Sequence, residues 1–102
     1  MSEKLGVAVT TRDHMSHVLG LAKAAKRAGK PTQIFFTGEG VCLTQDPRFP
    51  ELLEVASVGV CEASYIANGY KEKEVPGLLD KDFVTQGRNA EMVEASDRYL
   101  IL

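Results

Sequence analysis

The stretch Ala56-Ser57-Val58-Gly59-Val60-Cys61-Glu62-Ala63-Ser64 decides the fold that we predict for this chain. Its first half has the small and β-branched residues of a buried parallel strand, and its second half can begin a helix. In open α/β sheets, ligands and reactive groups collect outside the carboxyl ends of the strands. A thiol near a helix N-terminus also lies at the positive end of the helix dipole, which lowers its pKa. We therefore predict that Cys61 is the functional residue.

The segments on either side predict an alternating α/β fold with a mostly parallel sheet. The expected strands are residues 4–10, 33–37, 55–60, 82–85 and 98–102, and helices are expected up to about residue 28 and over residues 50–54, 62–68 and 89–95. The first strand, helix and second strand form a βαβ unit, which predicts a right-handed crossover and parallel pairing.

The ends and buried sides of these elements are also predicted from residue type. We expect Thr11 or Asp13 to cap the first helix and Gly29 to end it. Gly69 is the expected stop of the third helix. The final strand is expected to be buried. The buried side of the third helix is expected to consist of small and apolar side chains, namely Ala63, Ile66 and Ala67.

The length of 102 residues is that of one domain, which we expect to span residues 1–102. So short an α/β chain has little surface left for a closed internal pocket, which favours an active site at a subunit interface. The formal net charge is -2, so no overall positive field is available to attract nucleic acid. The basic residues between positions 23 and 30 fit the solvated face of a helix.

We expect the protein to be cytoplasmic and not to associate with a membrane. The first residues run into a strand without the basic and apolar segments of a signal peptide. No apolar run approaches the roughly 18 residues of a membrane span. Two cysteines in a cytosolic chain are more often reduced thiols or a redox pair than a structural disulfide, so we expect this of Cys42 and Cys61.

Histidine and glutamate side chains near Cys61 are candidates for a shared site. His14 and His17 lie at the start of the first helix, where a Cys–His pair can form, although two solvent-facing histidines fit the same pattern. Glu62 adjoins the thiol, where it can hold a water molecule or a proton. The chain lacks the close cysteine spacing of specific zinc motifs, so no metal and no other cofactor is expected.

The segment Gly38-Glu39-Gly40-Val41 forms a turn in which two glycines let the backbone bend sharply beside the sheet edge. It is not a dinucleotide fingerprint, because it lacks the third glycine and a clear following helix. Cys42 comes directly after this turn. It is either a resolving thiol for Cys61 or a packed loop thiol.

Four segments carry a resemblance to a known family: the opening strand with its alanine-rich helix ending in Ala28-Gly29-Lys30, the stretch from Ile34 to Val41, Val60-Cys61 with the helix up to Asn68-Gly69, and the closing residues 94–100. In order and spacing they resemble the DsrE/DsrF-like family of small sulfur-relay proteins, which includes the TusBCD subunits. The resemblance implies a three-layer sandwich of flavodoxin-related layout, assembled into trimers or hexamers. It also implies that Cys61 accepts sulfane sulfur as a persulfide. Asn68 departs from the family, which often has an arginine there.

The expected function is a sulfur carrier of the sulfurtransferase type, with sulfur donor and acceptor proteins as partners. Cys61 is the expected sulfur acceptor, and the expected binding residues are Thr11, His14, Gly38, Gly40, Cys42, Glu62 and Ser64. The alternative is a non-catalytic oligomeric subunit or a small-ligand-binding module in which Cys61 is buried and unreactive. A third hypothesis is a metal-binding module that uses His14, His17 and Cys61.

Overall fold

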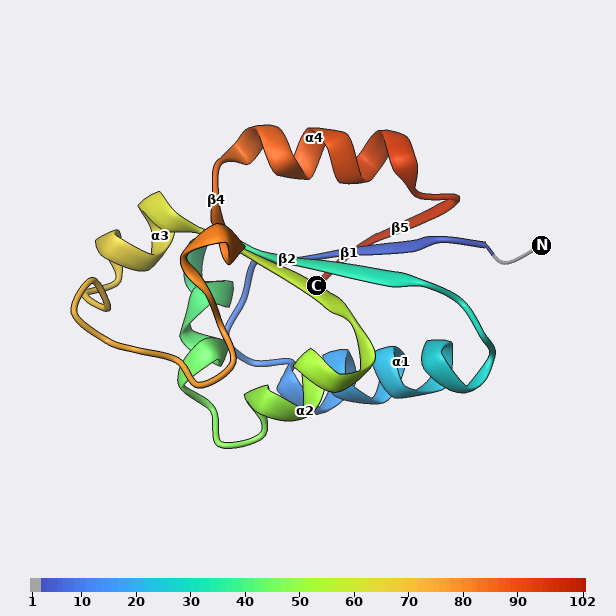
Figure 1. Cartoon of the computed structure of the whole chain (residues 1–102), viewed down its shortest axis with the longest axis horizontal. Coiled ribbons are helices and arrows are strands. Elements are labelled where there is room, and N and C mark those ends of the chain that lie inside the picture. The colour runs from blue at the N-terminus through green and yellow to red at the C-terminus, as the bar shows by residue number, and fades with distance from the viewer. Residues whose placement is uncertain (1–2) are drawn as a thin grey trace.

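The computed structural model describes residues 3–102 and forms a three-layer α/β sandwich (Figure 1). Its sheet has five strands, all parallel, in the order β4-β3-β2-β1-β5. The strands are β1 (Leu5–Val9), β2 (Thr32–Phe36), β3 (Ser57–Cys61), β4 (Phe83–Val84) and β5 (Arg98–Ile101). The helices are α1 (Met15–Arg27), α2 (Phe49–Val55), α3 (Glu62–Ala67) and α4 (Gln86–Ala95), with the 3-10 helices η1 (Gly38–Gln45) and η2 (Asp80–Asp82). The predicted fold class is therefore confirmed.

The order of the strands explains why helices cover both faces of the sheet. The chain steps in one direction from β1 to β4, and right-handed crossovers then place the intervening helices on one face. Strand β5 lies beyond β1, so the last crossover runs in the opposite direction and α4 lies on the other face (Figure 1). The chain therefore leaves the ends of β3 and β4 toward different faces of the sheet.

Two apolar layers hold the helices against the sheet. The larger layer lies on the side of α1 and α2, and it includes Phe36, Phe49 and Leu52, all fully buried. Helix α1 contributes four buried residues to this layer at the three- and four-residue spacing of one helix face, namely Met15, Val18, Leu19 and Ala22. The layer beneath α4 is much thinner, with Ala8, Phe35, Cys61 and Met92 as its buried members.

Glycine ends α1 and α3 as the sequence predicts. Gly29 and Gly69 have φ of 72° and 86°, a left-handed conformation that glycine adopts without steric cost. In each case the residue after the glycine donates its backbone N–H to the carbonyl five residues earlier, which closes a Schellman motif. At the other end of α1 the prediction is wrong: His14 is the N-cap residue, and no side chain caps the helix.

Three further expectations differ from the structure. The final strand is largely exposed, because β5 lies at the edge of the sheet with only β1 beside it. In α3 the buried residue is Tyr65, whose ring packs on Phe83 at 4.9 Å between centroids, and the expected buried residues Ala63, Ile66 and Ala67 are exposed. Helix α4 begins at Gln86, three residues before the expected start. Within residues 3–102, no helix is long and apolar enough to cross a membrane.

Replacing Gly40 by alanine is expected to destabilise the fold by about 1–3 kcal/mol, because the new Cβ collides with the backbone carbonyl of Val9. Gly20→Ala is the matched control. Its Cβ meets no neighbouring atom within 4 Å, and alanine in a helix is favoured over glycine by roughly 0.5–1 kcal/mol. Thermal unfolding of both variants measures the difference. Equal stability of the two variants would contradict the close packing of η1 on β1.

Candidate functional site

Cys61 lies where the chain divides between the two faces of the sheet. It is the last residue of β3 and the N-cap residue of α3, and its side chain belongs to the thin layer beneath α4. Gln86, the first residue of α4, donates a hydrogen bond from Nε2 to Cys61 Sγ at 3.4 Å. Such a switch point is the usual place for a site in an open α/β sheet, because the connections there diverge and leave a crevice.

Polar groups from three segments act on the pKa of the Cys61 thiol, and one of them, Gln86, makes a hydrogen bond to Sγ. The groups are the hydroxyl and backbone N–H of Ser64 in α3, the side-chain amide of Gln86 and the hydroxyl of Thr37 after β2. The backbone N–H of Gly38 donates to Ser64 Oγ at 3.0 Å, and the hydroxyls of Ser64 and Thr37 are hydrogen-bonded to each other at 3.4 Å. Gln86 Nε2 likewise donates to Thr37 Oγ1 at 2.8 Å and so fixes the position of that hydroxyl.

The net effect of this environment is a lowered pKa. Burial of Cys61, which is 3% exposed, acts in the opposite direction and raises the pKa of the thiol. The hydrogen bonds from Ser64, Gln86 and Thr37 stabilise the thiolate and together outweigh burial, so the pKa of Cys61 lies below its ordinary value. The site therefore stabilises the thiolate of a sheltered sulfur more than an ordinary cysteine environment does.

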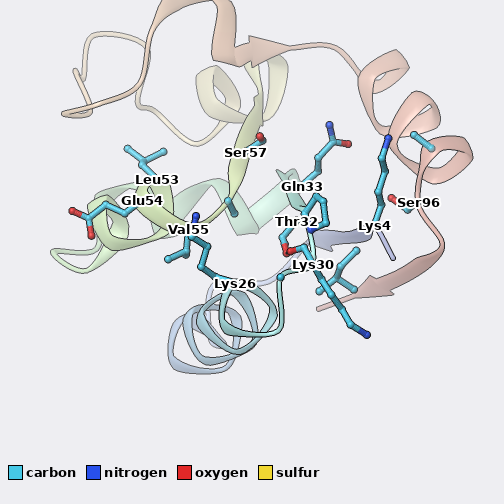
Figure 2. Close-up of a pocket in the computed structure, with 15 residues that line it drawn as sticks. Lys4, Lys26, Lys30, Thr32, Gln33, Leu53, Glu54, Val55, Ser57 and Ser96 are labelled. Carbon is cyan, nitrogen blue, oxygen red and sulfur yellow. The ribbon is translucent and has the colours of Figure 1, made fainter. Parts of the chain in front are cut away.

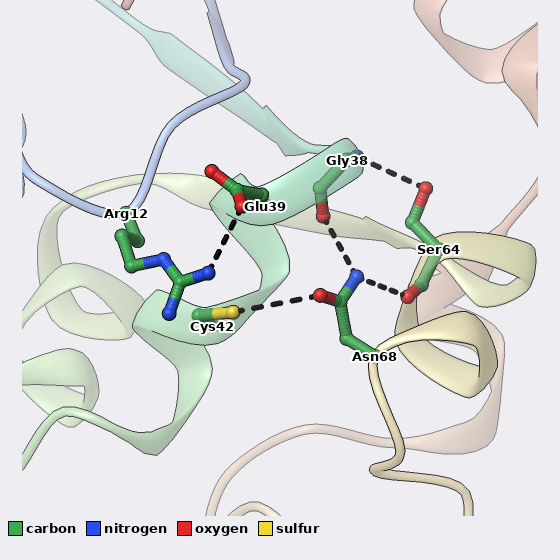
Figure 3. Close-up of polar contacts among 6 residues, drawn as sticks. All are labelled: Arg12, Gly38, Glu39, Cys42, Ser64 and Asn68. Atoms are coloured by element: carbon green, nitrogen blue, oxygen red, sulfur yellow. Dashed lines mark hydrogen bonds and ion pairs between the residues drawn. The ribbon is translucent and has the colours of Figure 1, made fainter.

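Cys42 lies next to this site and is linked to it through one asparagine (Figure 3). Cys42 Sγ donates to Asn68 Oδ1 at 3.8 Å. Asn68 Nδ2 in turn donates to the carbonyl oxygens of Ser64 at 2.8 Å and Gly38 at 3.2 Å. The same amide thus contacts the second thiol and fixes the loop and helix that supply donors to Cys61.

An ion pair and a tyrosine flank Cys42. Arg12 Nη2 lies 2.9 Å from Glu39 Oε2 (Figure 3), and this hydrogen bond is the main reason why the pKa of Arg12 is raised. The pKa of Tyr70 is raised mainly by its hydrogen bond with Cys42 and then by burial. Cys42 is half-buried, so it is the more open of the two thiols.

Of the expected binding residues, Gly38 and Cys42 are linked to Ser64 and Asn68 beside the site, whereas four others lie apart from it. Thr11 donates through Oγ1 to the carbonyl oxygen of Leu102 at 3.4 Å, beside β5. His14 is exposed and packs edge to face on His17, with ring centroids 6.5 Å apart. Glu62 is exposed and lines a groove under the loop at residues 71–80. Gly40 is buried on the carbonyl of Val9 and shapes η1. Of the two alternatives that the sequence left open for the histidines, the structure therefore supports two solvent-facing side chains and not a Cys–His pair, within residues 3–102.

The metal hypothesis lacks a ligand set. Among residues 3–102, no three side chains of histidine, cysteine, aspartate or glutamate are grouped so that they can hold a metal ion. Cys61 and the pair of His14 and His17 thus remain separate features of the described structure.

A depression of about 570 Å³ lies at the opposite, amino edge of the sheet (Figure 2). Lys4, Lys26 and Lys30 line it, but they do not converge on one point. Lys30 pairs with Glu3 at 3.8 Å. No cysteine or histidine lines the depression, so it offers no thiol comparable to Cys61.

Three residues of the site were not among the sequence-predicted set: Thr37, Gln86 and Asn68. The sequence carries a signal for Thr37 and Gln86, because both lie at the carboxyl ends of predicted strands and the carboxyl ends of neighbouring parallel strands meet at one edge of the sheet. Thr37 follows β2 and Gln86 lies two residues after β4. The late predicted start of the last helix left Gln86 in a loop and hid its position.

Comparison with protein-family models gives no match to this chain, and comparison with curated proteins gives none either.

Replacing Ser64 by alanine is expected to raise the pKa of Cys61, because the thiolate loses a hydrogen bond that lowers it. The rate of alkylation by iodoacetamide, followed across pH in a Cys42→Ser background, reports the fraction of thiolate. The midpoint of this profile should move to higher pH in Ser64→Ala. It should stay in place in Ser57→Ala, which removes an exposed hydroxyl from the other end of β3. An unchanged midpoint in Ser64→Ala would show that this hydroxyl does not stabilise the thiolate.

Proposed function

We propose that the protein is a sulfur carrier that holds sulfane sulfur as a persulfide on Cys61 and passes it to a partner protein. The main support is the position of Cys61 at the switch point of the sheet, where Gln86 donates a hydrogen bond to its sulfur and neighbouring polar groups lower its pKa. A cysteine that only fills a core needs no such donors, because a neutral thiol is a weak hydrogen-bonding group.

The proposed reaction is a pair of thiol exchanges that needs no added oxidant or reductant. The Cys61 thiolate attacks the terminal sulfur of a donor persulfide. A new S–S bond forms to Cys61 as the donor's S–S bond breaks, and the donor leaves as a thiolate with the electron pair. A thiolate of the acceptor then attacks the terminal sulfur on Cys61, and Cys61 is released as a thiolate again.

The surrounding residues have distinct tasks in this scheme. Ser64 and Thr37 stabilise the negative sulfur before attack and after release, since their donors are already oriented by Gly38 and Gln86. Gln86 also covers the thiol. Its own side chain is exposed, so a rotation of that side chain can open the crevice to a donor without a change in the sheet.

Cys42 has a secondary role in this proposal. It is the more open thiol and is joined to the Ser64 loop through Asn68, which suits a resolving or auxiliary acceptor thiol. A carrier of this kind works where thiols stay reduced, which is consistent with the expected cytoplasmic location. Its partners are then sulfur donor and acceptor proteins, and the sequence resemblance supports a homo-oligomer.

The burial of Cys61 is the observation that favours the alternative of a non-catalytic subunit or a small-ligand-binding module. In that alternative the thiol does not react in the native protein. The two functions therefore differ in a property that can be measured directly.

Incubation with a low-molecular-weight persulfide donor is expected to add the mass of one sulfur atom to the native protein, reversibly by a thiol reductant. Intact-mass spectrometry should find this adduct in wild type and in Cys42→Ser, and lose it in Cys61→Ser. Circular dichroism of the three proteins checks that each is folded. Loading that persists in Cys61→Ser, or no loading of folded wild type, would overturn the proposal.

Replacing Gln86 by alanine is expected to make the Cys61 sulfur easier to reach but the thiol harder to ionise. The alkylation rate of Cys61 at high pH, where the thiol is fully ionised, should rise several-fold because the cover is gone. The pKa should rise as well, since a donor to the sulfur is lost. Gln33→Ala, an exposed glutamine at the other end of the sheet, is the matched control. An unchanged rate at high pH would show that Gln86 does not limit access.

A further inference from the structure

Strand β5 is an open edge of the sheet with unusually apolar side chains. Leu100 and Ile101 are 42% and 66% exposed. Natural proteins usually protect such an edge with lysine, proline, a bulge or a very short strand. The opposite edge follows this rule, because β4 has two residues. Residues 98–101 contain neither lysine nor proline, and β5 pairs with β1 in an unbroken register.

The free backbone groups of β5 belong to Tyr99 and Ile101. Arg98 donates its N–H to the Lys4 carbonyl at 3.1 Å, and Leu102 donates to the Ala8 carbonyl at 2.8 Å. In a parallel ladder, alternate residues of a strand bond to the same neighbour, so the backbone of Leu100 also faces β1. The N–H and C=O groups of Tyr99 and Ile101 therefore point away from β1 and from the rest of the sheet.

The helix above this edge adds to the apolar surface. Asn89 of α4 accepts a hydrogen bond from the Tyr99 hydroxyl at 3.1 Å, so this side of α4 faces β5. Val93 lies one turn further along the same side and is 45% exposed. Among the exposed large apolar side chains of residues 3–102, Leu100 and Ile101 thus lie on β5 and Val93 lies on the side of α4 that faces it.

We propose that β5 pairs antiparallel with β5 of a second copy of this chain, which joins the two sheets across a two-fold axis. The axis passes beside Leu100. Tyr99 then lies opposite Ile101 of the second copy in a hydrogen-bonded pair, and Ile101 lies opposite the second Tyr99. This register satisfies the free groups of both strands with about four hydrogen bonds.

The side chains fit the same register. On the α4 face, each tyrosine lies opposite an isoleucine, an aromatic and β-branched pair of the kind that stabilises antiparallel strands. On the other face, Leu100 meets Leu100 of the second copy. Arg98 is the only charged residue of β5, and the two copies of it lie roughly 13 Å apart along the strands, so repulsion between them is weak.

The proposed interface is separate from the Cys61 crevice. Strands β2 and β1 lie between β3 and β5, so pairing at β5 leaves the thiol site unobstructed. Failure of sulfur loading and failure of pairing are therefore independent results.

Sedimentation velocity of the full chain tests the interface. Wild type is expected to sediment as a multiple of two copies. Ile101→Lys and Ile101→Pro are expected to reduce the assembly with little loss of thermal stability, since the Ile101 N–H faces away from β1. Ile66→Lys is the matched control, an apolar residue 44% exposed on α3, and should leave the assembly unchanged. A monomeric wild type, or an assembly that survives Ile101→Pro, would overturn the proposal.

Disulfide cross-linking tests the register in a background of Cys42→Ser and Cys61→Ser. The two Leu100 positions form a non-hydrogen-bonded pair with Cα atoms about 4.5 Å apart, within reach of a disulfide. The two Ile101 positions are roughly 8 Å apart, which is too far. Mild oxidation should therefore give a covalent dimer with Leu100→Cys and little with Ile101→Cys. Equal cross-linking of both variants, or none of Leu100→Cys, would contradict the register.

Discussion

The right-handed crossover between parallel strands is the constraint on which the site depends. It keeps α1, α2 and α3 on one face while the chain steps from β1 to β4, and it sends α4 to the other face once β5 is placed beyond β1. The only divergence of neighbouring connections is then at the ends of β3 and β4. Cys61 ends the first of these strands, and Gln86 follows the second. A shared crevice for the two residues is a consequence of the topology.

The thin layer beneath α4 determines the chemistry of that crevice. A thiolate in an apolar layer is costly, and burial by itself raises the pKa of Cys61. Polar groups of Ser64, Gln86 and Thr37 outweigh burial and lower the pKa of Cys61. Each of these side chains is held in place by a further contact at the same edge of the sheet. The arrangement makes the thiolate easier to form while the sulfur stays covered, which is the combination that the proposed carrier role requires.

Local patterns predicted the parts of this structure that depend on local physics. The glycine stops after α1 and α3 and the parallel pairing of the βαβ unit each follow from neighbouring residues, and each is confirmed. The errors concern burial, which depends on distant segments. Residues 98–102 have the composition of a core strand, but the strand lies at an edge of the sheet and Ile101 is exposed. Helix α3 packs through Tyr65 because the later strand β4 supplies Phe83 as its partner. The role of Cys61 could be predicted from its position at the end of a strand. The position of its partner Gln86 could not, because it depends on how the chain crosses the sheet through α4.

The measurement that tests the central claim most directly is a crystal structure of the protein after treatment with a persulfide donor. The account predicts one additional sulfur atom bonded to Cys61 Sγ, in the crevice between α3 and α4 and within hydrogen-bonding distance of Ser64 or Gln86. An unmodified Cys61 that still packs beneath Met92, with the added sulfur on Cys42 or nowhere, would contradict it and return Cys61 to the role of a core residue.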